Sequence, residues 1–334
     1  MRSRKRGQGR GRSKQSDVAQ LGAVDTRAAL MEHFKRLLPP ESLPWMSGEA
    51  RPTRVGFRAH GLRASEEQVR AQLEGVGLNP SPISARRGAL SLPYEQRAQL
   101  THSPLCDEGA VYVMNPSSML AVEALDPRPG EEVLDLAAAP GGKSLLIADQ
   151  MQDKGRLACV EPVKKRFFKL KDNLKRGGVT MAKLYLADGA AVGRKVPQRF
   201  DRVLLDAPCS SEARVRLDEP ESWAHWSPRK VREVARKQRK LLLSALQSVK
   251  VGGRVVYSTC SLSPEENELV VSEALRRFEG EAEPVAHQLS EVPSTPSLTS
   301  WGKLKLDPRL KHALRVVPDG LYHAFFLCVL TRRS

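Results

Sequence analysis

The sequence predicts an α/β fold in which a mostly parallel sheet carries helices on both faces. Beyond Pro116, short apolar segments alternate with helix-sized stretches, and this rhythm is typical of parallel strands joined by crossover helices. The strand segments are EVLDLA, GRLACVE, AKLYLAD, DRVLLDAP and GRVVYSTC. A turn of small residues follows the first of them. Before Pro116 the pattern is shorter and mixed, so we expect a second, smaller unit.

We predict three parts: a basic tail (residues 1–22), a small α+β domain (residues 23–115) and the larger α/β domain (residues 116–334). The first 14 residues contain seven lysines and arginines and no acid. Such a segment has too little apolar surface to fold, so we expect it to be disordered. The tail either tethers the protein to phosphate groups or only keeps it in solution, and the sequence leaves both alternatives open.

In the small domain we expect a helix, a strand and a second helix. AALMEHFKRLL has helical spacing and ends before Pro39 and Pro40, whereas TRVGFRA has the pattern of a strand. The second helix is SEEQVRAQLEGVG, and Ser65 and Gln68 stand at the spacing of a capping box at its start.

In the large domain we expect the last pair of strands near Leu304 and in HAFFLCVLTRR. The segment EAEPVAHQLSEVPSTPSLTS, which precedes this pair, is rich in proline and serine. Clusters of these residues are typical of loops, so we predict a loop there.

Composition excludes several classes of protein. The 334 residues include 54 lysines and arginines against 38 acids, a formal net charge of +16, which favours a polyanionic partner such as nucleic acid. We find no run of about 18 apolar residues that would span a bilayer and no secretory signal, so we expect a cytoplasmic protein. The five cysteines form no CxxC pair and predict neither a disulfide framework nor a zinc site.

The turn after the first strand has the composition of a ligand-binding loop. It reads Ala137, Ala138, Ala139, Pro140, Gly141, Gly142, Lys143. Small residues let the backbone approach a ligand, and the helix that follows points its amino terminus at it. A P-loop needs glycine where Ala137 stands, and the GxGxxG fingerprint is missing. Triphosphate and nicotinamide ligands are therefore disfavoured.

Acidic residues end the next two strands, Glu161 the second and Asp188 the third. A carboxylate at the end of the second strand is able to accept hydrogen bonds from both hydroxyls of a ribose. Together with the turn of small residues, this pattern predicts S-adenosylmethionine as the cofactor. For Glu161 the alternative is a solvated residue that precedes the turn at Pro162.

Two cysteines follow the fourth and fifth strands. Cys209 comes after LLDAP and Cys260 after YST, so both are expected at the carboxyl edge of the sheet and in the same crevice. Their polar surroundings and the expected closeness of Lys143 favour a thiolate. The remaining cysteines, Cys106, Cys159 and Cys328, are expected to be small buried apolar side chains.

The blocks DLAAAPGGKS, LLDAPCSS and YSTCSLSPEENE, in this order, resemble the signature blocks of the RsmB/Nop/Sun family of RNA cytosine-5 methyltransferases. The likeness extends to YVMNPSSM, WSPRKVREVARKQRKLLLSAL and RVVPDGLYHAFFLCVL, and it covers roughly residues 25–332. Residues 57–65 resemble the RNA-binding region of the family, with Arg58 at its usual arginine and His60 where asparagine is usual.

This resemblance implies a Rossmann-like methyltransferase domain with a mostly parallel seven-stranded sheet, preceded by a small RNA-binding domain. It implies that Cys260 is the nucleophile, that Cys209 assists product release, and that Asp206 and Lys143 line the base pocket. The residues predicted to bind the cofactor are Ala137, Ala138, Ala139, Pro140, Gly141, Gly142, Lys143, Glu161, Arg166, Asp188 and Asp206.

The sequence departs from the family pattern at three places. Ala137 stands where many members have cysteine, SSEARVR follows Cys209 where Ser-Gly-Glu/Thr-Gly is common, and Ala324 stands where a glycine often precedes the paired aromatic residues. None of these departures removes a predicted catalytic group. The second lies at the expected wall of the base pocket and bears on the choice of target.

The chemistry explains why two thiols and an acid are useful together. Addition of a thiolate to carbon 6 of cytosine, with a hydrogen bond or proton at ring nitrogen 3, turns carbon 5 into a nucleophile for the sulfonium methyl group. The proton on carbon 5 must then leave before the thiol is eliminated, which requires a base or a bound water near Cys209. Asp206 is the expected partner of the ring edge. The target base must be flipped out or already unpaired.

A basic segment offers further contacts to RNA. Arg229, Arg232, Arg236 and Lys240 have the spacing of one helix face, which is suited to a phosphate backbone, although a solvated face is the alternative. The side chains that we consider for stacking on bases are Trp223, Trp226 and Tyr257, with core packing as the alternative for at least one.

We therefore predict an S-adenosylmethionine-dependent RNA cytosine-5 methyltransferase that acts on ribosomal RNA, as a monomer and without a metal. The same chemistry on transfer RNA is the first alternative. The second is an RNA-binding ribosome-assembly factor in which methyl transfer is incidental or lost, and the presence of both cysteines argues against a lost site.

Overall fold

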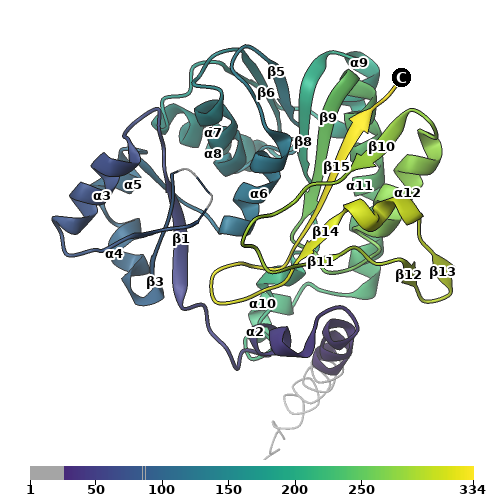
Figure 1. Cartoon of the computed structure of the whole chain (residues 1–334), viewed down its shortest axis with the longest axis horizontal. Coiled ribbons are helices and arrows are strands. Elements are labelled where there is room, and N and C mark those ends of the chain that lie inside the picture. The colour runs from purple at the N-terminus through teal and green to yellow at the C-terminus, as the bar shows by residue number, and fades with distance from the viewer. Residues whose placement is uncertain (1–25, 85, 87) are drawn as a thin grey trace, which may run out of the picture.

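The computed structural model describes residues 26–84, 86 and 88–334, so the predicted tail (residues 1–22) lies outside the described residues. The chain forms a small antiparallel sheet packed beside a large mixed sheet (Figure 1). The division at residue 115 into two domains stays a prediction.

The small sheet has four antiparallel strands, which lie in the order β2 (Ser81–Pro82), β3 (Ala89–Pro93), β1 (Arg54–Ala59), β4 (Val111–Val113). Helix α3 (Glu66–Glu74) packs its Val69 and Leu73 onto it. Ser65 Oγ accepts a hydrogen bond from the Gln68 amide, and the Gln68 side chain accepts one from the Ser65 amide. The predicted strand, helix and capping box are confirmed. The connection from β3 to β4 contains η2 (Tyr94–Gln96), α4 (Arg97–Thr101) and α5 (Pro104–Asp107).

The first helix, over residues 26–35, packs away from the small sheet. Its Leu30 and Phe34 are fully buried against Leu217 and Trp223 of the large unit. The helix ends before the two prolines, as predicted, and the chain continues through η1 (Pro40–Ser42) and α2 (Leu43–Ser47). The segment before β1 is therefore part of the surroundings of the large sheet.

The large sheet contains the five predicted parallel strands in the order β9, β8, β5, β6, β7. They span β5 (Glu132–Asp135), β6 (Arg156–Val160), β7 (Ala182–Tyr185), β8 (Phe200–Asp206) and β9 (Val249–Thr259). Strand β15 (Phe325–Arg332), predicted in HAFFLCVLTRR, pairs antiparallel with β9. The order reverses at β5, so ligands are expected beyond the carboxyl ends of β5 and β8.

The carboxyl-terminal part differs from the prediction in three respects. The sheet has nine strands in the described chain and not seven, because β14 (Leu314–Val316), β11 (Ser294–Pro296) and β10 (Ala282–Val285) extend it beyond β15. Two of these lie inside the segment predicted as a loop. Leu304 belongs to β13 (Leu304–Lys305), which pairs with β12 (Ser300–Trp301) and, among the residues that the structure describes, not with the large sheet. Edge strands tolerate proline and polar residues, so composition did not indicate them.

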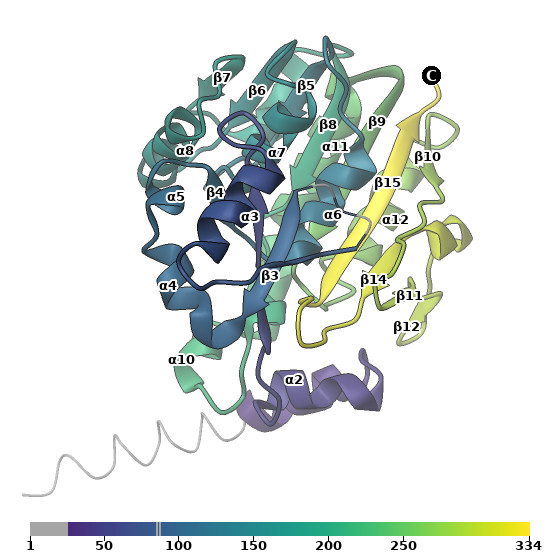
Figure 2. The ribbon, with the colours of Figure 1, turned by 60° about the vertical axis from the view of Figure 1, so that its left-hand side comes forward.

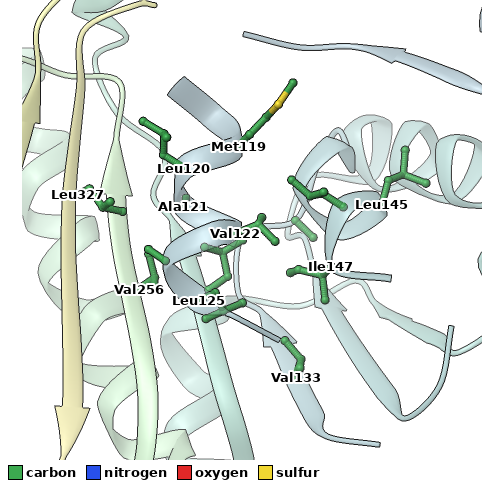
Figure 3. Close-up of a cluster of buried hydrophobic side chains, with 14 of the residues drawn as sticks. Met119, Leu120, Ala121, Val122, Leu125, Val133, Leu145, Ile147, Val256 and Leu327 are labelled. Atoms are coloured by element: carbon green, nitrogen blue, oxygen red, sulfur yellow. The ribbon is translucent and has the colours of Figure 1, made fainter. Parts of the chain in front are cut away.

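Helices cover both faces of the large sheet, as predicted. One face carries α6 (Pro116–Leu125), α7 (Gly142–Gln150) and α8 (Lys164–Arg176), and the other carries α9 (Val192–Lys195), α11 (Pro228–Ser248) and α12 (Glu268–Arg277). Figure 3 shows α6 packed between α7 and the strands β9 and β15. The smaller elements η3 (Gly189–Ala191), η4 (Glu212–Arg214), α10 (Pro220–Trp223) and η5 (Pro308–His312) lie in the connections.

The end of β1 and the loop after it join the small sheet to α7 and α8 (Figure 2). The buried Arg58 forms an ion pair with Asp149 of α7. Arg58 Nη2 also donates to His60 Nδ1 at 2.9 Å, and His60 Nε2 donates to the Gly177 carbonyl at 2.9 Å. Arg63 Nε donates to the Arg176 carbonyl at 2.9 Å. The small sheet is thus docked at the carboxyl ends of two helices of the large unit.

Within the described part of the chain, none of the helices combines the length and the apolar character that a membrane crossing requires.

Candidate active site

A cavity of about 820 Å³ lies between the small sheet and the carboxyl edge of the large sheet. Its wall brings together the turn at residues 137–143, Asp206 from β8 and Cys260 from the loop after β9. The small sheet contributes Tyr112 from β4. Strands β5, β8 and β9 are neighbours, so their carboxyl ends deliver these groups to one place.

The turn of small residues is closely packed. Gly141 has a φ of +111° and stands immediately before α7, and this left-handed conformation favours glycine. A Cβ on Gly142 would lie 2.7 Å from Tyr112 Cε1, so a larger residue there would displace the tyrosine. From α8, Asn173 Nδ2 donates to the Pro140 carbonyl at 2.8 Å and Arg166 Nη2 to the Ala139 carbonyl at 2.7 Å. Side chains of α8 therefore hold the backbone of the turn in place, and the turn forms part of the cavity wall.

Glu161 is a buried carboxylate with a free oxygen. The side chain is 1% exposed, and Glu161 Oε1 accepts a hydrogen bond from the Val163 amide at 2.9 Å. Glu161 Oε2 has no hydrogen-bond partner in the described chain, although Arg166 Nη1 lies 3.5 Å away as an ion-pair partner. A buried acceptor without a donor is costly, and a ribose hydroxyl would satisfy it. The residues present therefore fit the ribose of S-adenosylmethionine.

Not all of the predicted cofactor residues meet at the cavity wall. Glu161, Arg166 and Asp188 lie outside the residues that line it. Asp188 is exposed, and its Oδ1 accepts a hydrogen bond from the Ala190 amide at 3.0 Å. Arg166 contacts the turn through its hydrogen bond to Ala139 and approaches Glu161, so it has a structural role beside any contact with a ligand.

Lys143 and Asp206 form an ion pair at the cavity. Lys143 Nζ lies 2.6 Å from Asp206 Oδ2, and Ser258 Oγ donates to Asp206 Oδ1 at 2.9 Å. Lys143 and Asp206 together present a donor and an acceptor to a ligand.

Asp135, at the end of β5, is almost fully buried and accepts a hydrogen bond from Ser144 Oγ at 2.6 Å. Burial raises the pKa of Asp135 to about 6.

The two predicted cysteines meet. Cys209 Sγ lies 3.2 Å from Cys260 Sγ, and both residues are free thiols. A hydrogen bond from Cys209 lowers the pKa of Cys260, whereas the same contact and burial raise the pKa of Cys209. These directions make Cys260 the more acidic thiol of the pair, with Cys209 as its hydrogen-bond donor. Among the other cysteines, Cys159 and Cys328 are buried, as expected, and Cys106 is half-buried.

Two buried glutamates next to the cysteine loops were not predicted from the sequence. Glu212 and Glu266 are both fully buried and join the loops that carry Cys209 and Cys260. Glu266 lies within the block YSTCSLSPEENE, and Glu212 lies in the segment SSEARVR that departs from the family pattern. A glutamate in a polar segment is usually exposed, and only the fold shows that these two are buried. Tyr112 was also missed because its contact with Gly142 crosses between the two sheets.

The predicted base-stacking residues have other roles in this fold. Tyr257 is fully buried and donates its hydroxyl to the Glu266 carbonyl, and Trp223 is buried in the core beneath the first helix. The Trp226 indole donates to Glu212 Oε1 at 2.7 Å. Core packing, the alternative kept for at least one of these side chains, is what the structure shows for Tyr257, which has no access to a ligand.

The four predicted RNA contacts of α11 are exposed, but they do not line the cavity, and they are Arg229, Arg232, Arg236 and Lys240. Their contact with RNA stays a prediction. In the part of the chain that the structure describes, no group of three or more histidine, cysteine, aspartate or glutamate side chains is arranged to hold a metal ion.

Comparison with known proteins identifies the family. The family model described as 16S rRNA methyltransferase RsmB/F matches residues 122–328, more than half of the chain. The chain is 34% identical to the tRNA (cytosine(49)-C(5))-methyltransferase of Pyrococcus abyssi, over 91% of this chain and 95% of the relative. It is 44% identical to ribosomal RNA small subunit methyltransferase F of Escherichia coli O1:K1, over 66% of this chain and 47% of the relative. The chain thus spans about half the length of the F-type relative.

Solved structures agree with this assignment. A methyltransferase homologue from Pyrococcus horikoshii superposes with a TM-score of 0.74 at 29% identity, over 92% of this chain and 99% of the other. NSun6 from the same organism, solved with SFG, has a TM-score of 0.77 at 21% identity, over 91% and 98% of the chains, and shows a likeness of fold alone. The predicted family, the fold class and S-adenosylmethionine as the cofactor are confirmed. This chain belongs to the RsmB/F family of S-adenosylmethionine-dependent methyltransferases.

Proposed function

We propose that this enzyme methylates carbon 5 of cytosine in RNA through a covalent bond between Cys260 and carbon 6 of the base. The observation that carries the proposal is the contact of 3.2 Å between Cys209 Sγ and Cys260 Sγ. Cys260, the Lys143–Asp206 pair and the turn at residues 137–143 share the wall of one cavity. A nucleophile, a polar pair for the base and a cofactor loop are the parts that this chemistry needs.

The enzyme side chains act first on the cytosine ring. Cys260 thiolate adds to carbon 6, and the electron pair of the ring double bond moves towards carbon 5 and ring nitrogen 3. The Lys143 ammonium donates a hydrogen bond to the negative charge that develops on the ring edge, while the Asp206 carboxylate accepts one from the exocyclic amino group. When bound, S-adenosylmethionine supplies the methyl group that carbon 5 accepts.

Release of the product reverses the covalent bond. The proton on carbon 5 passes to a water in the open cavity, the double bond re-forms, and the bond between carbon 6 and Cys260 Sγ breaks. Cys209 donates its hydrogen bond to the leaving sulfur, which stabilises the Cys260 thiolate. The pKa of Cys209 is raised well above its usual value, so this residue is a proton donor at neutral pH.

For the substrate we favour ribosomal RNA, in line with the F-type relatives that share up to 44% identity with this chain among those compared. Transfer RNA is the second candidate. It is favoured by the Pyrococcus abyssi relative, because that match extends over 95% of the relative and the F-type match over 47%.

The test combines methyl incorporation with mapping of the product. Purified enzyme and labelled S-adenosylmethionine are incubated with separated ribosomal RNA, transfer RNA and small ribosomal subunits from a strain that lacks the gene, with Cys260→Ala as the control. Bisulfite sequencing then locates the modified cytosine. Incorporation at one cytosine of ribosomal RNA is the expected result. Incorporation only into transfer RNA would replace the substrate, and no incorporation into any fraction would contradict the proposal.

A further inference from the structure

Glu212 connects the two cysteine loops from a fully buried position. It follows Cys209 by three residues, yet its Oε2 accepts hydrogen bonds from the backbone amides of Leu262 and Ser263, both at 2.8 Å. These two residues follow Cys260. A side chain of the first loop thus holds the backbone of the second loop.

The other oxygen of this carboxylate is equally engaged. Glu212 Oε1 accepts hydrogen bonds from Trp226 Nε1 and Ser263 Oγ, both at 2.7 Å, and His33 Nε2 lies 3.3 Å away. Burial opposes ionisation, but the hydrogen bonds from His33, Trp226 and Ser263 lower the pKa of Glu212 to about 2. The carboxylate is therefore charged at neutral pH, and the first helix supplies one of its partners.

Glu266 makes the reciprocal connection from the second loop to the first. Its Oε2 accepts hydrogen bonds from the Ser210 amide and from Gln238 Nε2, both at 2.9 Å, and its Oε1 accepts one from Ser261 Oγ at 3.0 Å. Ser210 is adjacent to Cys209, and Ser261 is adjacent to Cys260. In addition, the Ala213 amide donates to the Cys260 carbonyl at 3.0 Å.

We propose that Glu212 and Glu266 are positioning residues that hold the Cys209 thiol against Cys260 Sγ. This inference rests on the proposed roles of the two cysteines. Neither glutamate lines the cavity, so neither is placed to touch the base or the cofactor. Their carboxylate oxygens accept hydrogen bonds from backbone and serine groups of both cysteine loops. The pairing of β8 with β9 ends at Asp206 and Ser258, so beyond this point these hydrogen bonds hold the two loops at a fixed distance.

The substitution Glu212→Gln should loosen this arrangement while it preserves the volume. A carboxylate accepts hydrogen bonds at both oxygens, whereas an amide presents N–H groups at one of them. These N–H groups would face either the two loop amides or the Trp226 indole, and donors that face each other repel. The loops should separate, and Cys260 should lose the hydrogen bond that favours its thiolate.

The test measures the alkylation of Cys260 by iodoacetamide against pH, resolved by peptide mass spectrometry, in the full chain. Wild type is compared with Glu212→Gln, Cys209→Ala and the double variant. Each single variant should shift the midpoint of Cys260 alkylation upward by about one pH unit, and the double variant should shift it no further than Cys209→Ala alone. An unchanged midpoint in Glu212→Gln, or shifts that add in the double variant, would overturn the positioning role.

Two further variants keep the test decisive. Glu123→Gln removes a half-buried carboxylate that pairs with Arg86 Nε at 3.2 Å on the other side of the sheet, and it should leave the midpoint unchanged. If Glu212→Gln does not fold, Trp226→Phe removes a single hydrogen bond to Glu212 and should give a smaller upward shift, whereas the wild-type midpoint in this variant would count against the proposal. Alkylation of Cys260 requires no methyl transfer, so this test does not depend on the proposed function. The proposed function has its own test, because full methylation activity of Cys260→Ala would overturn it.

Discussion

Cys209 Sγ lies 3.2 Å from Cys260 Sγ, although the two residues are 51 positions apart in the chain. The contact follows from the pairing of β8 with β9, in which Asp206 is the register partner of Ser258. Each cysteine follows its strand within three residues, so the parallel register brings both thiols to the same edge of the sheet. The pairing of two strands thus determines which thiols meet.

Replacement of Cys260 by alanine should abolish methylation and leave cofactor binding nearly intact. The thiolate attacks the base and not the cofactor, so turnover should fall at least about a thousandfold, while the Kd for S-adenosylmethionine from titration calorimetry changes little. Cys106→Ser is the matched control, since the Cys106 thiol donates to the Leu100 carbonyl and does not line the cavity. Equal turnover by wild type and Cys260→Ala would remove the nucleophile assignment.

Replacement of Cys209 by serine or alanine should trap the enzyme on its RNA. Without the hydrogen bond to the leaving sulfur, elimination slows while addition continues, and protein should accumulate that is bound to RNA through Cys260. A denaturing gel resolves this adduct, and the double variant Cys209→Ala/Cys260→Ala should not form it. Full turnover without any adduct would show that Cys209 is only structural.

Glu161→Gln should weaken the binding of S-adenosylmethionine about 10- to 100-fold, because a hydrogen bond to a charged acceptor contributes about 1.5–3 kcal/mol. The reason is the buried Oε2 that lacks a donor. Titration calorimetry measures the affinity, and Asp172→Asn on the exposed face of α8 is the control. An unchanged Kd would mean that Glu161 does not contact the cofactor and only accepts the hydrogen bond from the Val163 amide.

His60→Asn should make the protein less sensitive to acid. Burial, and then the charge of Arg58, lower the pKa of His60 to about 4 from 6.5, so the folded protein resists a proton that the unfolded chain accepts. The stability that His60 contributes is complete above about pH 6.5 and is lost as the pH falls towards 4, in total about 3 kcal/mol.

Asparagine has an acceptor for Arg58 and a donor for the Gly177 carbonyl, so the docking of the small sheet should persist in this variant. Urea unfolding at pH 7 and pH 4.5 measures the difference. His323, whose pKa burial also lowers to about 4, remains in both proteins, so its effect cancels in the comparison. Equal loss of stability in wild type and variant would exclude His60 as the source.

The basic face of α11 should contribute to the salt dependence of the affinity for RNA. If Arg229, Arg232, Arg236 and Lys240 each neutralise a phosphate, their joint replacement by glutamine should reduce the slope of log affinity against log salt by about 3, at about 0.7 per contact on single strands. Lys230 and Lys237 on the same helix both pair with Glu233, and their replacement should change the slope less.

The basic tail should behave differently from the helix. Deletion of residues 1–16 should raise the KM for RNA and leave kcat unchanged, because we expect the basic side chains of this segment to attract phosphates without positioning the base. A quadruple α11 variant that kept the wild-type slope, while the tail deletion alone reduced it, would exclude the helix as an RNA contact.

The sequence was informative wherever hydrophobic periodicity or fixed spacing determines structure. The five parallel strands, the turn at residues 137–143 and the meeting of Cys209 with Cys260 follow from strand order and from the rule that ligands bind at carboxyl ends. It was uninformative where a contact joins distant segments. His33 was assigned to the small domain, but its helix packs on connecting segments of the large unit and reaches Glu212, since Leu30 and Phe34 fit the apolar cluster there.

Burial of polar groups is the second property that the sequence did not show. Glu212 and Tyr257 lie in polar or mixed segments, and only the surrounding loops and helices remove them from water. The short strands β10 and β11 were missed for a related reason. They are held by backbone hydrogen bonds at a sheet edge, which leave little trace in the order of apolar residues.

Helix α7 carries Lys143 in its first turn and Asp149 in its last. Its nine residues span about 13 Å at 1.5 Å per residue, so this helix connects the two places at a fixed separation. The amino-terminal end of α7 follows the turn at residues 137–143, and the carboxyl-terminal end forms the ion pair with Arg58 of the small sheet. We expect a cofactor that restrains the first turn of α7 to restrain the Asp149–Arg58 contact as well, so protection of the Arg58 and His60 amides from hydrogen exchange should rise when S-adenosylmethionine binds.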